Sequence, residues 1–291
     1  MSTVVGLGLA ACLGGGLFVA RELLAAFPAV NLRLFREPAF CLLCGTAFFN
    51  TMGLFGGLFM VPIFLQQVMG FTALQAGLLI LPALPFSSLS GLLTGRLSDR
   101  FPPPFVAIAG LLTMMAIFQA FASVTVFTTV AVLLGYNILY RVFMDTVSIP
   151  VTILALRTLA VDQVRMGQGL LGVVRSIGAS FGVTVTSVFF ERRRTWHQHQ
   201  LYAIYASNSP THDATLHELP LALHHAGVPA VTQDQGALGA IRQEMDVEAI
   251  AVSFRESSLL ICLRSLLAMG PLLWLCRRAH LQELVSLPSS S

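Results

Sequence analysis

Seven long apolar runs, separated by polar connections, limit what this chain can fold into. They are approximately Val4–Ala20, Phe40–Leu65, Gln75–Gly95, Phe105–Ala122, Phe127–Val151, Gly169–Phe190 and Ser257–Leu275. An α-helix needs about 20 apolar residues to cross about 30 Å of hydrocarbon, and each run has about that length. Lipid offers no hydrogen-bond partner to an open strand edge, and no alternating ten-residue pattern occurs. The runs therefore predict helices rather than a β-barrel.

The composition also predicts an all-α, polytopic membrane protein of about seven transmembrane helices. Of the 291 residues, 55% are hydrophobic and only 11% are charged, whereas soluble domains carry about 25% charged residues. The net charge of +3 comes from arginines that are spread over the connections, without interleaved aromatic residues. This pattern argues against nucleic acid as a partner and favours membrane lipid.

The placement of arginine predicts the orientation in the membrane. Basic residues follow the first, third, fifth and seventh runs, whereas connections 66–74 and 123–126 hold no charge. The positive-inside rule then places the N-terminus outside and the C-terminus in the cytoplasm of a plasma (inner) membrane protein. We expect a linker helix and its cytoplasmic connection over 1–38, a bundle over 39–278 and a cytoplasmic tail over 279–291.

The connection 191–256 is long and polar, and we expect it to be an outer loop. Helical spacing of its apolar residues predicts a short surface helix over Gln235–Ala249. The loop holds six of the seven histidines, and imidazole suits zinc, copper or nickel. The histidine spacings match no closed metal site, however, and polar loops tolerate histidine, so we expect no metal. Since the sequence has no Gly-x-Ser-x-Gly, P-loop or HExxH motif, we expect neither a cofactor nor an enzyme.

The stretch Gly91–Pro104, GLLTGRLSDRFPPP, ends the third run. Gly91 and Gly95 are four positions apart and predict a small-residue face that lets another helix approach closely. Asp99 can accept from unpaired backbone N–H groups or pair with an arginine. The prolines can occupy the first turn of the next helix, where a missing N–H is harmless. We interpret the stretch as a conformational latch between two spans, whose charged residues are Arg96, Asp99 and Arg100.

Polar residues inside the apolar runs or directly at their ends are candidates for a functional cavity. Arg141 and Asp145 are four positions apart and predict an ion pair on one helix face. The pair is either structural or a protonatable aspartate whose proton affinity is set by the arginine. Arg264 is unpaired by sequence, although Glu256 can reach toward the same side. The other candidates either line a cavity for small amphiphilic substrates or form interhelical hydrogen bonds; they are Asn50, Gln66, Gln67, Asn137 and Tyr140.

The latch resembles the signature loop of the major facilitator superfamily, Gly-x-Leu-Ala/Ser-Asp-Arg-x-Gly followed by basic residues. Pro102–Pro104 replace the glycine and the basic pair of that motif. Leu65–Pro82 and Phe27–Phe40 resemble segments of the fourteen-span drug:proton antiporters of the EmrB/QacA type. Gly167–Gly182 resembles their thirteenth span, with Arg175 at the family's arginine. The residues that match the signature loop are Gly95, Leu97, Ser98, Asp99 and Arg100.

The resemblance runs from about Val4 to Arg278 and covers the family's eighth to fourteenth spans. It implies a proton-coupled multidrug exporter, with the proton gradient as the coupling ion and small amphiphilic molecules as substrates. It also implies an N-terminal half-transporter as partner, because the family keeps its proton-binding acid in that half. Two alternatives stay open: a non-transporting membrane fragment or partner-binding protein, and a metal-dependent membrane enzyme that uses the histidine-rich loop.

Overall fold

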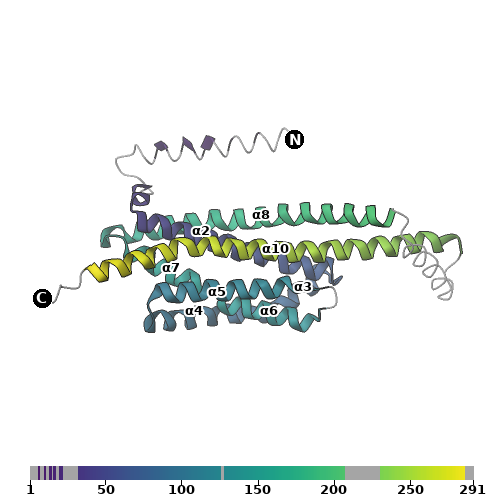
Figure 1. Cartoon of the computed structure of the whole chain (residues 1–291), viewed down its shortest axis with the longest axis horizontal. Coiled ribbons are helices and arrows are strands. Elements are labelled where there is room, and N and C mark those ends of the chain that lie inside the picture. Colours follow the sequence, from purple (N-terminus) through teal and green to yellow (C-terminus); the bar gives the residue numbers. More distant parts are fainter. Residues whose placement is uncertain are drawn as a thin grey trace.

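The part of the chain that the structure describes is an all-α bundle (Figure 1). The computed structural model describes residues 32–125, 128–206 and 230–285, together with a few isolated positions before residue 32. Within these ranges, six helical segments are long and apolar enough to cross a membrane: Pro38–Gln67, Ala73–Arg100, Pro103–Ala122, Val130–Arg157, Val161–Ala203 and Met245–Leu275. They correspond to the second to seventh runs, which confirms an all-α, polytopic membrane protein. The first run, Val4–Ala20, lies almost entirely outside the described residues.

The elements follow the order of the apolar runs, and two of the spans consist of more than one helix. In chain order the elements are η1 (Leu32–Arg36), α2 (Pro38–Gln67), α3 (Ala73–Ile80), η2 (Leu81–Ala83), α4 (Leu84–Arg100), α5 (Pro103–Ala122), α6 (Val130–Phe143), α7 (Asp145–Arg157), η3 (Val161–Gln163), α8 (Val164–Ala206) and α10 (Ala230–Val285).

Prolines lie at or close to the interruptions of these two spans. The 3₁₀ turn η2 contains Pro82 and separates α3 from α4. Pro150 lies inside α7, close after the break at Met144 that separates α7 from α6. Proline has no N–H to bond the carbonyl four residues earlier, and its ring crowds that carbonyl. At Pro150 the affected carbonyl belongs to Thr146, at the start of α7.

Helix α2 is the central helix of the bundle. The helices α8 and α10 pack along it, α10 also packs on α5, and α7 contacts both α2 and α5. Helices α4 and α6 pack on each other and complete the bundle on the side away from α8 (Figure 1). Buried apolar side chains form two clusters, one around Phe64, Phe118 and Phe254 and the other around Phe40 and Leu171.

Glycines on α8 let its backbone approach α2 closely. A Cβ atom at Gly178 would lie 2.8 Å from the carbonyl oxygen of Phe48, and one at Gly182 would collide with the backbone of Met52. The pair Gly178 and Gly182 is therefore a small-residue contact between α8 and α2. The expected contact at the latch is not formed, because no described atom lies within 4 Å of a Cβ built on Gly91 or Gly95.

Helices α8 and α10 are much longer than a membrane is thick. They contain 43 and 56 residues, or about 65 and about 84 Å of helix at 1.5 Å per residue. The structure thus differs from the expected outer loop: residues 191–206 continue α8, and 230–256 belong to α10. The predicted surface helix Gln235–Ala249 is part of α10 rather than a separate element. The rest of the expected loop, 207–229, lies outside the described residues.

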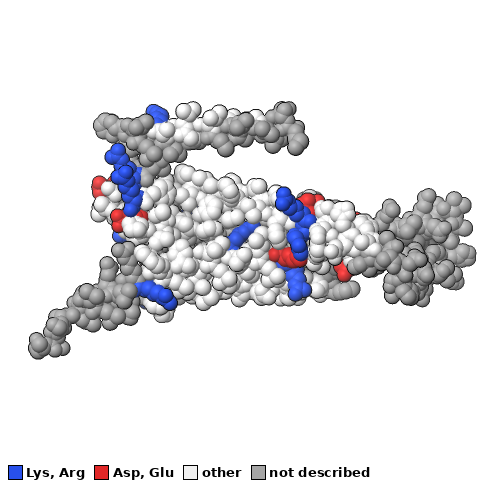
Figure 2. Space-filling model, turned by 45° about the horizontal axis from the view of Figure 1, so that its top comes forward, with Lys and Arg blue, Asp and Glu red and all other residues white. Residues whose placement is uncertain are grey.

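The charges lie where a membrane protein needs them. Figure 2 shows Arg, Asp and Glu side chains gathered toward the two ends of the bundle, with a wide and mostly uncharged belt between them. A basic patch also lies within the belt on this face (Figure 2). The hydrocarbon of the membrane surrounds this belt. Charged side chains within the belt therefore need partners inside the protein.

Candidate functional site

The break between α6 and α7 separates the two apolar clusters of the core. Tyr140 of α6 belongs to the first cluster, whereas Val147 of α7 belongs to the second. Polar side chains from three helices, α2, α4 and α8, meet α7 next to this break. We call these residues the polar layer; they are Asn50, Ser90, Thr94, Asp145, Thr146, Ser148, Thr152 and Arg175.

Helices α2 and α4 reach the polar layer through neutral groups. The side-chain amide of Asn50 donates to the hydroxyl of Ser148 at 3.1 Å. The backbone N–H of Asp145 donates to the hydroxyl of Ser90 at 3.0 Å. That N–H is in the first turn of α7 and has no partner within its own helix, so Ser90 completes the hydrogen bonding of this helix end. The hydroxyls of Thr94 and Thr146 lie 3.5 Å apart.

Arg175 brings a positive charge from α8 into the polar layer. Its Nη2 atom donates to the carbonyl oxygen of Ser148 at 2.9 Å and to the hydroxyl of Thr152 at 2.5 Å. It also interacts electrostatically with Asp145. Arg175, Ser148 and Asp145 are half-buried, so part of this charged group is accessible rather than sealed in the core.

The predicted ion pair between Arg141 and Asp145 is not among the ion pairs of the described residues. A spacing of four places two side chains on one face only if the helix is continuous. Here Met144 interrupts the helix between them. Asp145 interacts electrostatically with Arg175 instead, and the Nε atom of Arg141 is buried without a hydrogen-bond partner in the described structure.

The other candidates of the fifth run lie inside the bundle. The hydroxyl of Tyr140 donates to the carbonyl of Leu54 at 2.5 Å, and Tyr140 is 1% exposed. Asn137 is also buried, and its side-chain oxygen has no partner within the described residues. The cavity beside Tyr140, also lined by Phe118 and Phe254, measures about 10 Å³. Such a cavity holds about one water molecule, so this region does not hold a drug-sized substrate.

The structure does not bring the remaining candidates into the polar layer. Gln66 and Gln67 are exposed at the end of α2. The charged latch residues Arg96, Asp99 and Arg100 are exposed in the last turns of α4. The prediction for the prolines is confirmed, since α5 begins at Pro103 with a proline in its first turn. The latch function stays a prediction.

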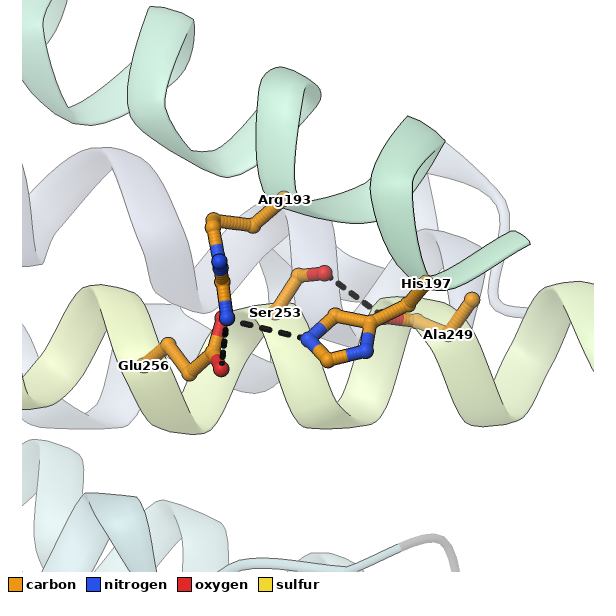
Figure 3. Close-up of polar contacts among 5 residues, drawn as sticks. All are labelled: Arg193, His197, Ala249, Ser253 and Glu256. Carbon is orange, nitrogen blue, oxygen red and sulfur yellow. Dashed lines mark hydrogen bonds and ion pairs between the residues drawn. The ribbon is translucent and has the colours of Figure 1, made fainter. Parts of the chain in front are cut away.

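The sequence reasoning missed a polar contact between α8 and α10, which we call the clasp (Figure 3). Arg193 donates from Nε and Nη2 to the two carboxylate oxygens of Glu256. His197 places its Nε2 atom 3.2 Å from the same carboxylate. Farther along the same two helices, Gln198 donates to Asp246 at 2.8 Å. Glu256 therefore pairs with α8 and not with Arg264. The sequence signal for this contact was the presence of basic residues at the start of 191–256 and of two acids, Asp246 and Glu256, near its end.

Comparison with known proteins places this bundle in a family. The family model described as Major Facilitator Superfamily matches residues 3–183, which is more than half of the chain. The chain belongs to the major facilitator superfamily. Its polar layer is therefore part of a multi-pass membrane protein of this superfamily.

Curated relatives match only part of their own length. The chain is 31% identical to "Uncharacterized MFS-type transporter YhcA" of Bacillus subtilis (strain 168), over 63% of this chain and 35% of the relative. It is 24% identical to "Fatty acid resistance protein FarB" of Neisseria gonorrhoeae, over 94% of this chain and 52% of the relative. It is 25% identical to "Lincomycin resistance protein LmrB" of Listeria monocytogenes, over 58% of this chain and 36% of the relative. The chain thus spans about half or less of the length of these relatives.

Proposed function

We propose that this chain forms the C-terminal helical bundle of a proton-coupled multidrug exporter of the fourteen-span, EmrB/QacA type, in the plasma membrane. The names of the relatives, which include transporters and resistance proteins, support export of small amphiphilic molecules. In transporters of this kind the substrate lies between two bundles that rock about it. One bundle supplies half of such a site, so the proposal includes a partner bundle.

The polar layer is the observation that carries this proposal. Within the six described apolar runs, Asp145 is the one carboxylate. A charged side chain near the bilayer centre costs about 2.5–3.5 kcal/mol on insertion scales, and such residues mark ion and substrate pathways. Asp145 interacts electrostatically with Arg175, is half-buried, and stands at a break between two half-helices. These features suit a group that responds to protons or to a cationic substrate.

In this mechanism Arg175 and Asp145 act together. Arg175 of α8 donates hydrogen bonds to Ser148 and Thr152, which lie one and two turns into α7. These hydrogen bonds connect α8 to α7. The charge of Arg175 favours the ionised form of Asp145. A proton or a bound cation on Asp145 weakens that attraction, which frees α7 to move relative to α8. The break at Met144 gives α7 a place to pivot without moving α6.

The test is uncoupler-sensitive efflux of ethidium from cells that lack their main exporters. The chain is expressed alone or beside the N-terminal half of a fourteen-span exporter. We expect efflux only from the pair, and we expect Asp145→Asn to reduce it at least about tenfold, a loss of about 1.4 kcal/mol or more in coupling. Asp162→Asn is the matched control, because Asp162 is exposed and outside the polar layer.

Two results would overturn the proposal. Uncoupler-sensitive efflux from the chain alone would show that no partner bundle is needed. Full efflux from the pair carrying Asp145→Asn would remove the polar layer from the mechanism. The metal-dependent enzyme has no specific observation in its favour, since no three of the described His, Cys, Asp and Glu residues gather at one place.

A further inference from the structure

Arg264 is a buried cation at the junction of three helices. It lies on α10, is 4% exposed, and donates from Nη1 to the hydroxyl of Thr186 on α8 at 2.7 Å. A Cβ atom at Gly56 of α2 would lie 3.2 Å from the same Nη1. The other terminal nitrogen, Nη2, is buried without a hydrogen-bond partner among the described residues.

The charges around Arg264 do not balance. The six described apolar runs hold three arginines, Arg141, Arg175 and Arg264, against one carboxylate. That carboxylate, Asp145, interacts with Arg175. On α10 itself the nearest acid toward the N-terminus is Glu256, which Arg193 and His197 hold in the clasp (Figure 3). Since a buried charge needs a partner, Arg264 requires an anion that the described side chains do not supply.

A second orphaned donor lies on the same face of α10. Ser257 is 0% exposed, and its hydroxyl has no partner within the described residues. It precedes Arg264 by seven positions, about two helical turns, so both side chains lie on one face. Helical side chains lean toward the N-terminus of their helix, which directs the guanidinium of Arg264 toward the level of Ser257. The hydroxyl of Thr186 accepts from Arg264 and so keeps its own O–H to donate.

We propose that Arg264, Thr186 and Ser257 form a binding site for a small monovalent anion such as chloride, enclosed between α2, α8 and α10. The side chains offer donors and a positive charge, which one acceptor-only ion satisfies together. The ion neutralises Arg264, one of the two arginines that the single carboxylate leaves unpaired. The close approach of Gly56 to Arg264 limits the site to a small ion. This inference does not depend on the proposed export function.

The test measures thermal unfolding of the purified full chain in lipid nanodiscs, in sodium chloride and in sodium gluconate at equal ionic strength. We expect chloride, and equally bromide, to raise the melting temperature of the unmodified protein. Arg264→Gln should lose this difference, whereas Arg277→Gln should keep it, because Arg277 is exposed near the end of α10. Equal melting temperatures in the two salts, as expected for a bound water, would overturn the proposal, as would a chloride effect that survives in Arg264→Gln.

Two further measurements apply even where Arg264→Gln does not fold. In Ser257→Ala the chloride concentration for half-maximal stabilisation should rise about tenfold, the effect of one lost hydrogen bond to a charged group. Crystals of the unmodified protein soaked in bromide should show anomalous scattering beside Nη2 of Arg264. An unchanged chloride response in Ser257→Ala removes Ser257 from the site, and a bromide map without that peak refutes the site altogether.

Discussion

Asn50 of α2 donates a hydrogen bond to Ser148 of α7 at 3.1 Å, across 98 positions of sequence. Asn50 is 7% exposed and lies in the middle of the central helix. Arg175 of α8 donates to the carbonyl of the same Ser148. Helices α2 and α8 pack most extensively against each other. Ser148 of α7 thus connects both of them to the interrupted span α6–α7.

Replacing Asn50 by Leu should destabilise the bundle. The substitution keeps the size of the side chain and removes the donor to Ser148. Interhelical hydrogen bonds in membranes are worth about 0.6 kcal/mol on average and at most about 1.7 kcal/mol, so we expect a loss in that range in the unfolding of the purified protein in detergent. Gln66→Leu is the control, because Gln66 is exposed. If the two variants unfold alike, the bond contributes nothing to stability.

The glycines of α8 should divide into sensitive and insensitive positions. Gly182→Ala places a methyl group against the backbone of Met52, and overpacking of this kind costs about 1–3 kcal/mol. Gly172→Ala meets no described atom within 4 Å and should stabilise the helix by up to about 1 kcal/mol. Thermal unfolding of both variants checks the opposite signs. Gly95→Ala serves as a second control, since the structure also leaves open space there.

Breaking the clasp should loosen the extension of α8. Glu256→Gln removes the charged partner of both Arg193 and His197, and we expect faster amide hydrogen exchange over residues 191–206. The double exchange of Arg193→Glu with Glu256→Arg should restore part of the protection. Arg194→Gln is the control, because its pair with Glu191 at 3.8 Å stays within one helix. Equal exchange in Glu256→Gln and the unmodified protein would mean that apolar packing alone holds the extension.

The latch can be tested through Asp99. This residue is exposed in the last turn of α4, so Asp99→Asn should leave the melting temperature of the purified chain unchanged. In a transporting assembly we expect the variant to lower ethidium efflux several-fold, because it removes a charge at the end of a span. Efflux equal to that of the parent would identify the stretch as a simple connection between α4 and α5.

The predicted orientation can be tested by cysteine labelling in a cysteine-free background. Single cysteines at Leu74 and Asn208 should react with an impermeant maleimide in intact cells, because the positive-inside rule places both outside. Cysteines at Arg100 and His280 should react only after the cells are opened. Labelling at position 100 in intact cells would invert the topology.

Local properties of the sequence determined the spans. A helix that crosses hydrocarbon must be apolar over about 20 residues whatever it packs against, so the runs from Phe40 to Leu275 could be placed without a tertiary structure. The same holds for the prolines at the start of α5, since a proline in a first helical turn depends only on its own backbone. The intramembrane residues Asp145, Arg175 and Arg264 also stand out by sequence alone, because charge is rare inside such runs.

Only the tertiary structure decided which of these residues meet. The break at Met144 separates Arg141 from Asp145, and Asp145 interacts electrostatically with Arg175 of another helix instead. Small-residue spacing occurs at Gly91 and Gly95 as well as at Gly178 and Gly182, yet within the described ranges only the second pair lies against a neighbouring helix. The physical reason is that hydropathy depends on each residue and its neighbours in the chain, whereas a pair across two helices depends on how both helices are rotated and where each one bends.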